Sequence, residues 1–227
     1  MNARGVRATA IAALVLLAAC TGSSPSPSSG SPEPNGPFRT TDMAAIELTP
    51  KDAPPGLGYV AAYSGDQDIV SFARDATEEQ HLVDDGFLAA NGVVFVPADR
   101  VNGGKLTPRD PIIQAILVVF SRGSGASSTL RRYLDDLRTR QLPDTADGAA
   151  PGLGDESYRL EGTNADGSGI TVFAWRRANL VLVLLGTSFP PPRTLRLAER
   201  MDDRAATAEG AAAASAAPSA SSTAPAS

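Results

Sequence analysis

Leu180-Val181-Leu182-Val183-Leu184-Leu185 decides the fold of this chain, because every residue in the stretch is aliphatic. A strand with one face in water alternates apolar and polar side chains, whereas a strand that is buried on both faces does not. The stretch therefore predicts a central β-strand that is covered on both sides. We expect the flanking sequence to supply the neighbouring strands and the helices that cover them.

Apolar runs bounded by turn residues predict the other strands of this sheet. The expected positions are 57–63, 87–96, 112–120, a strand after Pro151, and 170–176. Asn102-Gly103-Gly104 is a turn signal between the second and third of these, and a tight turn is expected at 177–179. Most of these connections are too short for crossovers, so the strands should pair antiparallel.

Helix signals occur at three places between and after these strands. Asp75 starts a capping-box spacing, and Gly86 ends that helix. The clearest helix spans 126–142, where apolar residues recur on one face and Pro143 bars continuation. Thr194 is expected to cap a final helix. The predicted fold class is α+β, a largely antiparallel sheet with helices packed on it, in one domain at 38–208 flanked by disordered tails.

The two ends of the chain differ in composition from this domain. Residues 20–37 are rich in Ser, Pro and Gly, which predicts a disordered tether. Residues 209–227 are rich in Ala, Ser and Pro, and Pro218 and Pro225 favour a disordered tail over a helix. Residues 1–19 combine two arginines with an apolar run that is shorter than the roughly 20 residues of a membrane span, which predicts a cleaved signal peptide.

The end of that signal, Leu17, Ala18, Ala19 and Cys20, resembles the bacterial lipobox of lipoprotein signal peptides. The resemblance implies that Cys20 receives a lipid, becomes the first mature residue, and holds the protein on the extracytoplasmic face of the cell membrane. Two acyl chains, at about 0.8 kcal/mol per buried methylene, suffice for stable attachment. The alternative is that Cys20 belongs to a signal that is cleaved nearby and lost.

The charge and thiol content narrow the function classes. Cys20 is the only cysteine, so the domain has neither a disulfide nor a thiolate metal site. Removing the two signal-peptide arginines from 20 basic residues leaves 18 against 25 acidic ones, a net charge of −7. An acidic chain without a basic run argues against nucleic-acid binding.

A second resemblance covers residues 151–181. The sequence PGLGDE at 151–156, with FAWRRANLV at 173–181, resembles part of many actinobacterial envelope lipoproteins and sensor-like ectodomains. Some of those have a PsbP-like fold and others the fold of PknH-type kinase sensor domains, which implies an antiparallel sheet between helices and no catalytic motif. Gly is usual there where this chain has Ala178. PGLG also occurs at 55–58, but the differing spacings that follow favour coincidence over duplication.

Candidate chemical groups are few. His81, the only histidine, would be needed for a Ser-His-Asp triad, but its acidic neighbours indicate a solvated helix face. Asn164, Asp166 and Ser168 resemble the first half of an EF-hand calcium loop, yet the twelfth position is Trp175 instead of Glu, which favours a simple hairpin loop.

Two glycine-containing segments complete the candidates. Asp155 and Glu156 are two adjacent carboxylates at the start of a strand. Neighbouring side chains of a strand point to opposite faces, which is poor geometry for shared acid/base chemistry, so a role in a turn is favoured. Gly123-Ser124-Gly125 precedes a helix and offers amides to an anion, although a helix cap is the commoner role. No catalytic motif occurs in the sequence, so we expect no enzyme activity and no cofactor.

Three functions follow from this pattern. The first is a non-catalytic module at the cell envelope that binds a ligand or lipid or acts as a sensor. A closed apolar cavity would support it. The alternative is a structural or regulatory protein-interaction module of the envelope. An exposed apolar patch without a cavity would support it. The third is an envelope hydrolase, which needs a cleft that brings His81 to a serine and a carboxylate.

Overall fold

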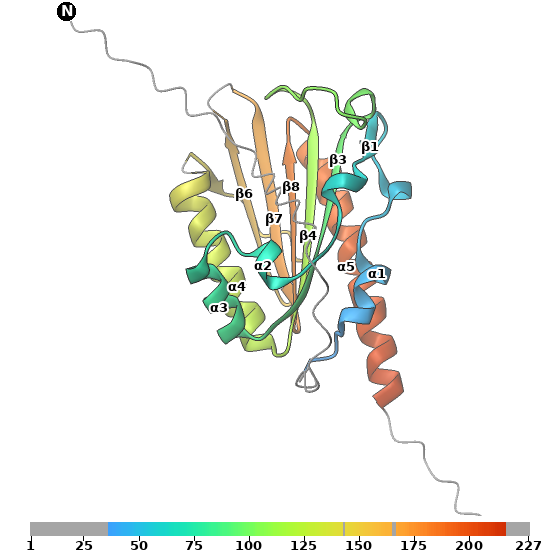
Figure 1. Cartoon of the computed structure of the whole chain (residues 1–227), viewed down its shortest axis with the longest axis vertical. Helices are drawn as coiled ribbons and strands as arrows, with labels where there is room; N and C mark the ends of the chain where they lie inside the picture. The colour runs from blue at the N-terminus through green and yellow to red at the C-terminus, as the bar shows by residue number, and fades with distance from the viewer. Residues whose placement is uncertain (1–35, 143, 165–166, 217–227) are drawn as a thin grey trace, which may run out of the picture.

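The computed structural model describes residues 36–142, 144–164 and 167–216 of the chain. It confirms the α+β fold: an antiparallel sheet runs in the order β1-β3-β4-β8-β7-β6-β5, and β2 also pairs with β3 (Figure 1). The strands are β1 (Leu57–Tyr59), β2 (Gly65–Gln67), β3 (Phe87–Pro97), β4 (Ile112–Phe120), β5 (Ala146–Asp147), β6 (Glu156–Thr163), β7 (Gly169–Arg177) and β8 (Leu180–Thr187).

The aliphatic strand β8 lies in the middle of this order, between β4 and β7. Leu180, Leu182 and Leu184 point into one hydrophobic cluster, and Val181 and Val183 point into another. Successive side chains of a strand alternate between the faces of the sheet, so these clusters are the two cores that cover β8. The expectation of a central strand buried on both faces is confirmed.

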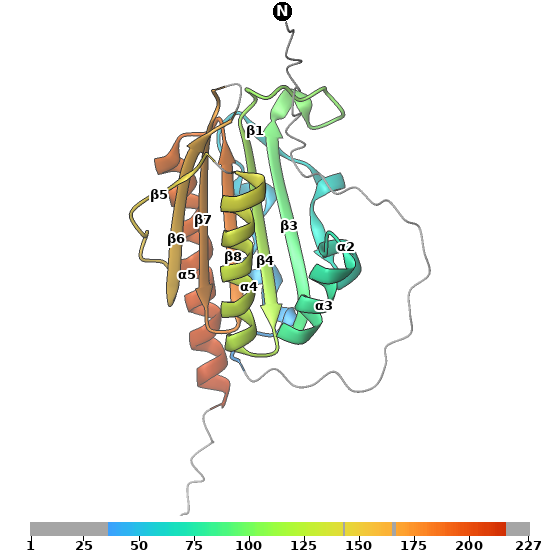
Figure 2. The same cartoon turned by 90° about the vertical axis from the view of Figure 1, so that its left-hand side faces the viewer.

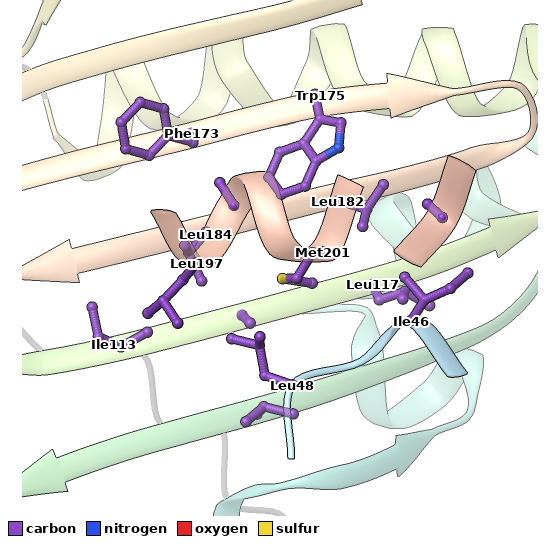
Figure 3. Close-up of a cluster of buried hydrophobic side chains, with 14 of the residues drawn as sticks. Ile46, Leu48, Ile113, Leu117, Phe173, Trp175, Leu182, Leu184, Leu197 and Met201 are labelled. Atoms are coloured by element: carbon purple, nitrogen blue, oxygen red, sulfur yellow. The ribbon is translucent and has the colours of Figure 1, made fainter. Parts of the chain in front are cut away.

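Helices cover the sheet on both faces, which makes three layers (Figure 2). On one face lie α1 (Met43–Ile46) and α5 (Pro191–Ala216), and on the other lie α2 (Ile69–Phe72), α3 (Ala76–Asp85) and α4 (Gly123–Asp136). The first core, between the sheet and α5, holds Trp175 and Phe173 of β7 against Leu197 and Met201 of α5 (Figure 3).

The second core lies beneath α4. Ala126, Leu130, Leu134 and Leu137 are buried there, which is the apolar face expected from the sequence. The helix begins at Gly123, three residues earlier than predicted, so Gly123-Ser124-Gly125 forms its first turn. A Cβ on Gly125 would lie 1.8 Å from the carbonyl oxygen of Asp85, so only Gly permits this approach of α4 to the end of α3. After Asp136 the chain continues as a π-helical turn, Leu137–Gln141.

Three predicted boundaries differ from the structure. The first strand ends at Tyr59, because a 3₁₀ turn at Ala61–Tyr63 leads the chain into β2. Thr194 does not cap the last helix, which begins at Pro191, a residue pre-organised for the first helical position. That helix also continues past residue 208 to Ala216, because alanines extend a helix that is already nucleated. Residues 217–227 of the expected tail lie outside the described residues.

The repeated PGLG segments are alike locally. Gly56 and Gly152 both have positive φ, of 86° and 74°, and the leucine after each is buried in the first core. In a duplicated domain, a two-fold axis perpendicular to the sheet would exchange β3-β4 with β7-β8. Such an axis does not exchange the two faces of the sheet, so the helices after β4 and β8 would cover the same face. Since α4 and α5 cover opposite faces, the halves are not symmetric copies.

Asn179 in the β7–β8 turn fixes the N-terminal strap, which we define as residues 36–47. Its side-chain amide receives a hydrogen bond from the N–H of Phe38 (3.1 Å) and donates to the carbonyls of Phe38 (2.9 Å) and Phe120 (2.6 Å). Asn179 and Phe38 are fully buried. Ala178 has a φ of 50°, so it adopts the left-handed conformation in this two-residue turn.

Replacing this asparagine should loosen the strap. Asn179→Ala leaves three buried backbone groups without a partner, and we expect the free energy of unfolding to fall by about 3 kcal/mol. Urea titration followed by fluorescence of Trp175 measures the change. Asn102→Ala, at an exposed loop position, is the matched control and should stay within about 0.5 kcal/mol of wild type. Equal losses in both variants would contradict the role of Asn179.

Candidate functional site

Several of the sequence-predicted site residues lie outside the described part of the chain. These are the lipobox residues Leu17, Ala18 and Ala19, the lipidation residue Cys20, and the calcium candidate Asp166. Within residues 36–216, leaving out 143, 165 and 166, no helix has both the length and the apolar character needed to cross a membrane.

The remaining calcium candidates close the loop between β6 and β7. The N–H of Asn164 donates to the carbonyl of Ser168 (2.8 Å), and Nδ2 of Asn164 donates to Oγ of Ser168 (2.7 Å). These bonds link the two candidates directly, as in a hairpin loop. Among the described residues, no group of three or more His, Cys, Asp or Glu side chains is arranged to hold a metal.

The other candidate groups have structural partners. His81 is exposed on α3, while the buried Asp85 of the same helix accepts hydrogen bonds from Thr129 (2.8 Å) and Arg132. Asp155 accepts from the N–H of Ala178 (2.7 Å) and from Arg176 (3.0 Å), so it does bind a backbone amide, though one distant in sequence.

Glu156 shares Arg176 with Asp155, at 3.6 Å from its Nε, and also has partners of its own. It accepts from Tyr158 Oη (2.6 Å) and from Ser127 Oγ (3.2 Å). Neither carboxylate of the pair is thus paired with His81, and both help to fix β6 against its neighbours.

Asp202 of α5 forms a buried polar centre that the sequence reasoning missed. It accepts hydrogen bonds from Trp175 Nε1 (3.1 Å) and from two nitrogens of Arg177 (3.1 and 2.8 Å). Arg177 also donates a hydrogen bond to Glu209, which lies seven residues after Asp202 in α5 (3.3 Å). The only available signal was the i, i+2 spacing of Trp175 and Arg177, which places both on one face of β7. This centre fixes α5 on the sheet.

Asp52 forms a second such centre, between α5 and the 3₁₀ turn Pro50–Asp52 that follows the strap. Arg204 donates to both carboxylate oxygens, Arg200 donates to one (2.9 Å), and Thr49 donates from its N–H (2.8 Å). Burial alone would raise the pKa of Asp52, but the hydrogen bonds from Arg204, Thr49 and Arg200 outweigh it and lower the pKa to about 2. Both arginines are therefore held toward the Pro50–Asp52 turn.

The strap and α5 border an open groove of about 1020 Å³. Small side chains from the second half of α5 form much of its wall, and charged side chains of both signs stand along it. The residues lining this strap groove are Gly36, Pro37, Arg39, Asp42, Ala45, Arg200, Asp203, Arg204, Thr207, Ala208, Ala211, Ala212, Ala213 and Ser215.

The strap groove follows α5 beyond the end of the sheet, where the helix projects from the domain (Figure 1). The part of α5 that lines the groove, residues 200–215, is roughly 23 Å long at 1.5 Å per residue. An extended polypeptide rises about 3.3 Å per residue, so roughly seven of its residues fit alongside. None of the sequence-predicted site residues lines this groove.

No protein-family model and no curated protein matches this sequence. Among solved structures, the extracellular domain of PknH from Mycobacterium tuberculosis is similar with a TM-score of 0.40 and 11% identity, over 68% of this chain and 79% of that one. A likeness of this size decides neither the details of the fold nor the function, so the proposals below rest on the residues of this chain.

The Asp52 centre predicts an acid-sensitive contribution to stability. Because its pKa in the folded state, about 2, lies below the ordinary value of 3.8, ionised Asp52 stabilises the fold above about pH 4. The contribution, about 2 kcal/mol, is lost as the pH falls from about 4 to about 2. Asp52→Asn should therefore be destabilised at pH 7, and urea titrations should show the difference from wild type shrinking toward pH 2.

The exposed Asp99 provides the control, since its side chain is 71% accessible. Asp99→Asn should match wild type within about 0.5 kcal/mol at every pH. If the deficit of Asp52→Asn were the same at pH 7 and pH 2.5, ionisation of Asp52 would not be its cause.

Proposed function

We propose that the protein is a non-catalytic binding module, held by a lipid on Cys20 at the extracytoplasmic face of the cell membrane. In this proposal the strap groove binds an extended segment of another envelope polypeptide. The single observation that carries it is the groove itself, an open channel of mixed charge and small side chains beside the point where the strap enters the domain.

An open groove favours the protein-interaction alternative over a ligand enclosed in the core. The space between α5 and the sheet is occupied by large buried side chains, including Trp175, Phe173 and Met201 (Figure 3). The space beneath α4 is filled in the same way by Leu130 and Leu134. A lipid or drug-sized ligand needs an apolar cavity of several hundred cubic ångströms, which these clusters do not leave at their positions.

The chemistry of the lining matches a peptide better than other ligand classes. Arg39 and Arg200 can donate to peptide carbonyls, and Asp42 and Asp203 can accept from peptide N–H groups. Alanines at 208, 211 and 212 let a backbone approach the helix closely. An acyl chain would place its apolar surface against these charged side chains, and a phosphate ligand would meet the two carboxylates.

The position of the groove agrees with tethering. Gly36, the first described residue, lines the groove, and residues 21–35 separate it from Cys20. Fifteen extended residues span at most about 50 Å. A module anchored in this way would present its groove to polypeptides within that distance of the bilayer.

The hydrolase alternative has no support from the arrangement of side chains. His81 is exposed, and the buried carboxylates at 52, 85 and 202 are all bound by arginines. A carboxylate held by arginine is committed to charge pairing and does not orient an imidazole.

The anchor is tested by Cys20→Ser. Without the thiol, no lipid can be attached, and the protein should move from the detergent phase to the aqueous phase in a Triton X-114 partition. Metabolic labelling with a radioactive fatty acid should be lost as well, because two acyl chains are what holds the protein on the membrane. Retention of the variant in the detergent phase would contradict lipid anchoring, while leaving the groove to be tested separately.

The groove is tested by site-specific crosslinking in intact cells of the source organism. A benzophenone amino acid at Ala211 should give a discrete, protease-sensitive adduct, whereas the same probe at the exposed Ala206 of α5, outside the groove, should not. Ala212→Arg should reduce the adduct by at least about tenfold, because a long cationic side chain fills the channel. Equal adducts from both positions, or no effect of Ala212→Arg, would exclude the groove as the binding site.

A further inference from the structure

The charged side chains that line the strap groove differ in what they already bind. Arg39 and Asp42 belong to the strap, whereas Arg200, Asp203 and Arg204 belong to α5. A charge that is paired inside the domain is already committed, whereas a charge without a partner is available to a bound polypeptide. The hydrogen bonds and ion pairs of these five side chains therefore show which of them a ligand would meet.

The two arginines of α5 are directed to Asp52. Arg204 donates to both oxygens of that carboxylate, at 3.1 and 2.9 Å, and also donates to the carbonyl of Glu47 (2.7 Å). Arg200 donates to the same carboxylate at 2.9 Å. The side chain of Asp52 is only 6% exposed, so water weakens these ion pairs less than it weakens pairs on the surface. A ligand in the groove would have to compete with Asp52 for both guanidinium groups.

Arg39 and Asp203 carry the charges that remain available. One oxygen of Asp42 is used within the strap, where it accepts the N–H of Arg39 at 2.7 Å. The guanidinium group of Arg39 and the carboxylate of Asp203 make no hydrogen bond and no ion pair with any residue that the structure describes. Both residues are exposed, and they lie on different walls of the groove, one on the strap and one on α5.

The fold holds the backbone of both residues in place. Arg39 directly follows Phe38, whose N–H and carbonyl are bound by the buried side chain of Asn179. Asp203 directly follows Asp202, whose contacts with β7 fix α5 on the sheet. Groups on a fixed backbone lose little conformational freedom when they bind, so a correctly placed partner gains more from them.

We propose that Arg39 and Asp203 determine which polypeptide the strap groove binds, namely a segment with an acidic side chain for Arg39 and a basic side chain for Asp203. This inference rests on the proposed function and names the class of its partner. The three arginines of the groove are balanced by its two aspartates and by Asp52, which binds two of them. A segment with charges of one sign would meet a like charge on one wall, whereas a segment with both signs pairs with both walls.

Charge reversal in the full-length protein, with the benzophenone probe at Ala211 in intact cells, tests this pairing. Arg39→Glu and Asp203→Arg should each reduce the adduct at least about tenfold, because each sets a like charge against the bound segment. Arg196→Glu and Glu199→Arg make the same charge changes at exposed positions of α5 outside the groove and should leave the adduct unchanged. An adduct that survives both groove reversals would overturn the proposal but leave the groove as the binding site, whereas absence of any adduct in wild type would contradict the groove itself.

The identity of the captured segment gives a second result, which misfolding of a variant cannot imitate. Mass spectrometry of the wild-type adduct should find both an Asp or Glu and a Lys or Arg in the crosslinked segment, and a segment that lacks either would overturn the proposal. Replacing the acidic residue of that segment by Lys should reduce the adduct with wild type and restore it with Arg39→Glu. Failure of this rescue would show that Arg39 does not pair with the partner.

Discussion

Burial of both faces of β8 is the constraint on which the rest of the structure depends. Since neither face of this strand can meet water, the chain must place a helix on each side of it, and α4 and α5 do so. The antiparallel neighbours β4 and β7 then complete the centre of the sheet. Such an arrangement without any disulfide relies on two well-filled cores, which is consistent with the size of the domain.

Buried carboxylates supply the polar contacts that join these layers. Asp202 connects β7 to α5, Asp52 connects the Pro50–Asp52 turn to α5, and Asp85 connects α3 to α4. Each is bound by at least one arginine, because an unpaired buried charge would be strongly destabilising. These pairs contribute mainly by determining how helices sit on the sheet, since apolar burial supplies most of the free energy.

Much of the fold could be predicted from the sequence, because its signals are local. The aliphatic run of β8, the apolar face of α4 and the turn residues before β1 each need only a few neighbouring residues to be recognised. The strap groove could not be predicted, because its walls are separated by more than 150 positions in the chain. The same holds for the contact of Asn179 with Phe38, 141 residues apart.

The hydrogen bonds between Asn179 and Phe38 also determine how the domain would respond to mechanical load. Any pull transmitted through the residues before Gly36 reaches the folded part first at Phe38. From there it passes through one side chain to the β7–β8 turn and to the end of β4. The force thus enters the domain at its three central strands, β4, β8 and β7, and not at an edge strand such as β1 or β5. A tether attached in this way can be stretched without unzipping the sheet from its side.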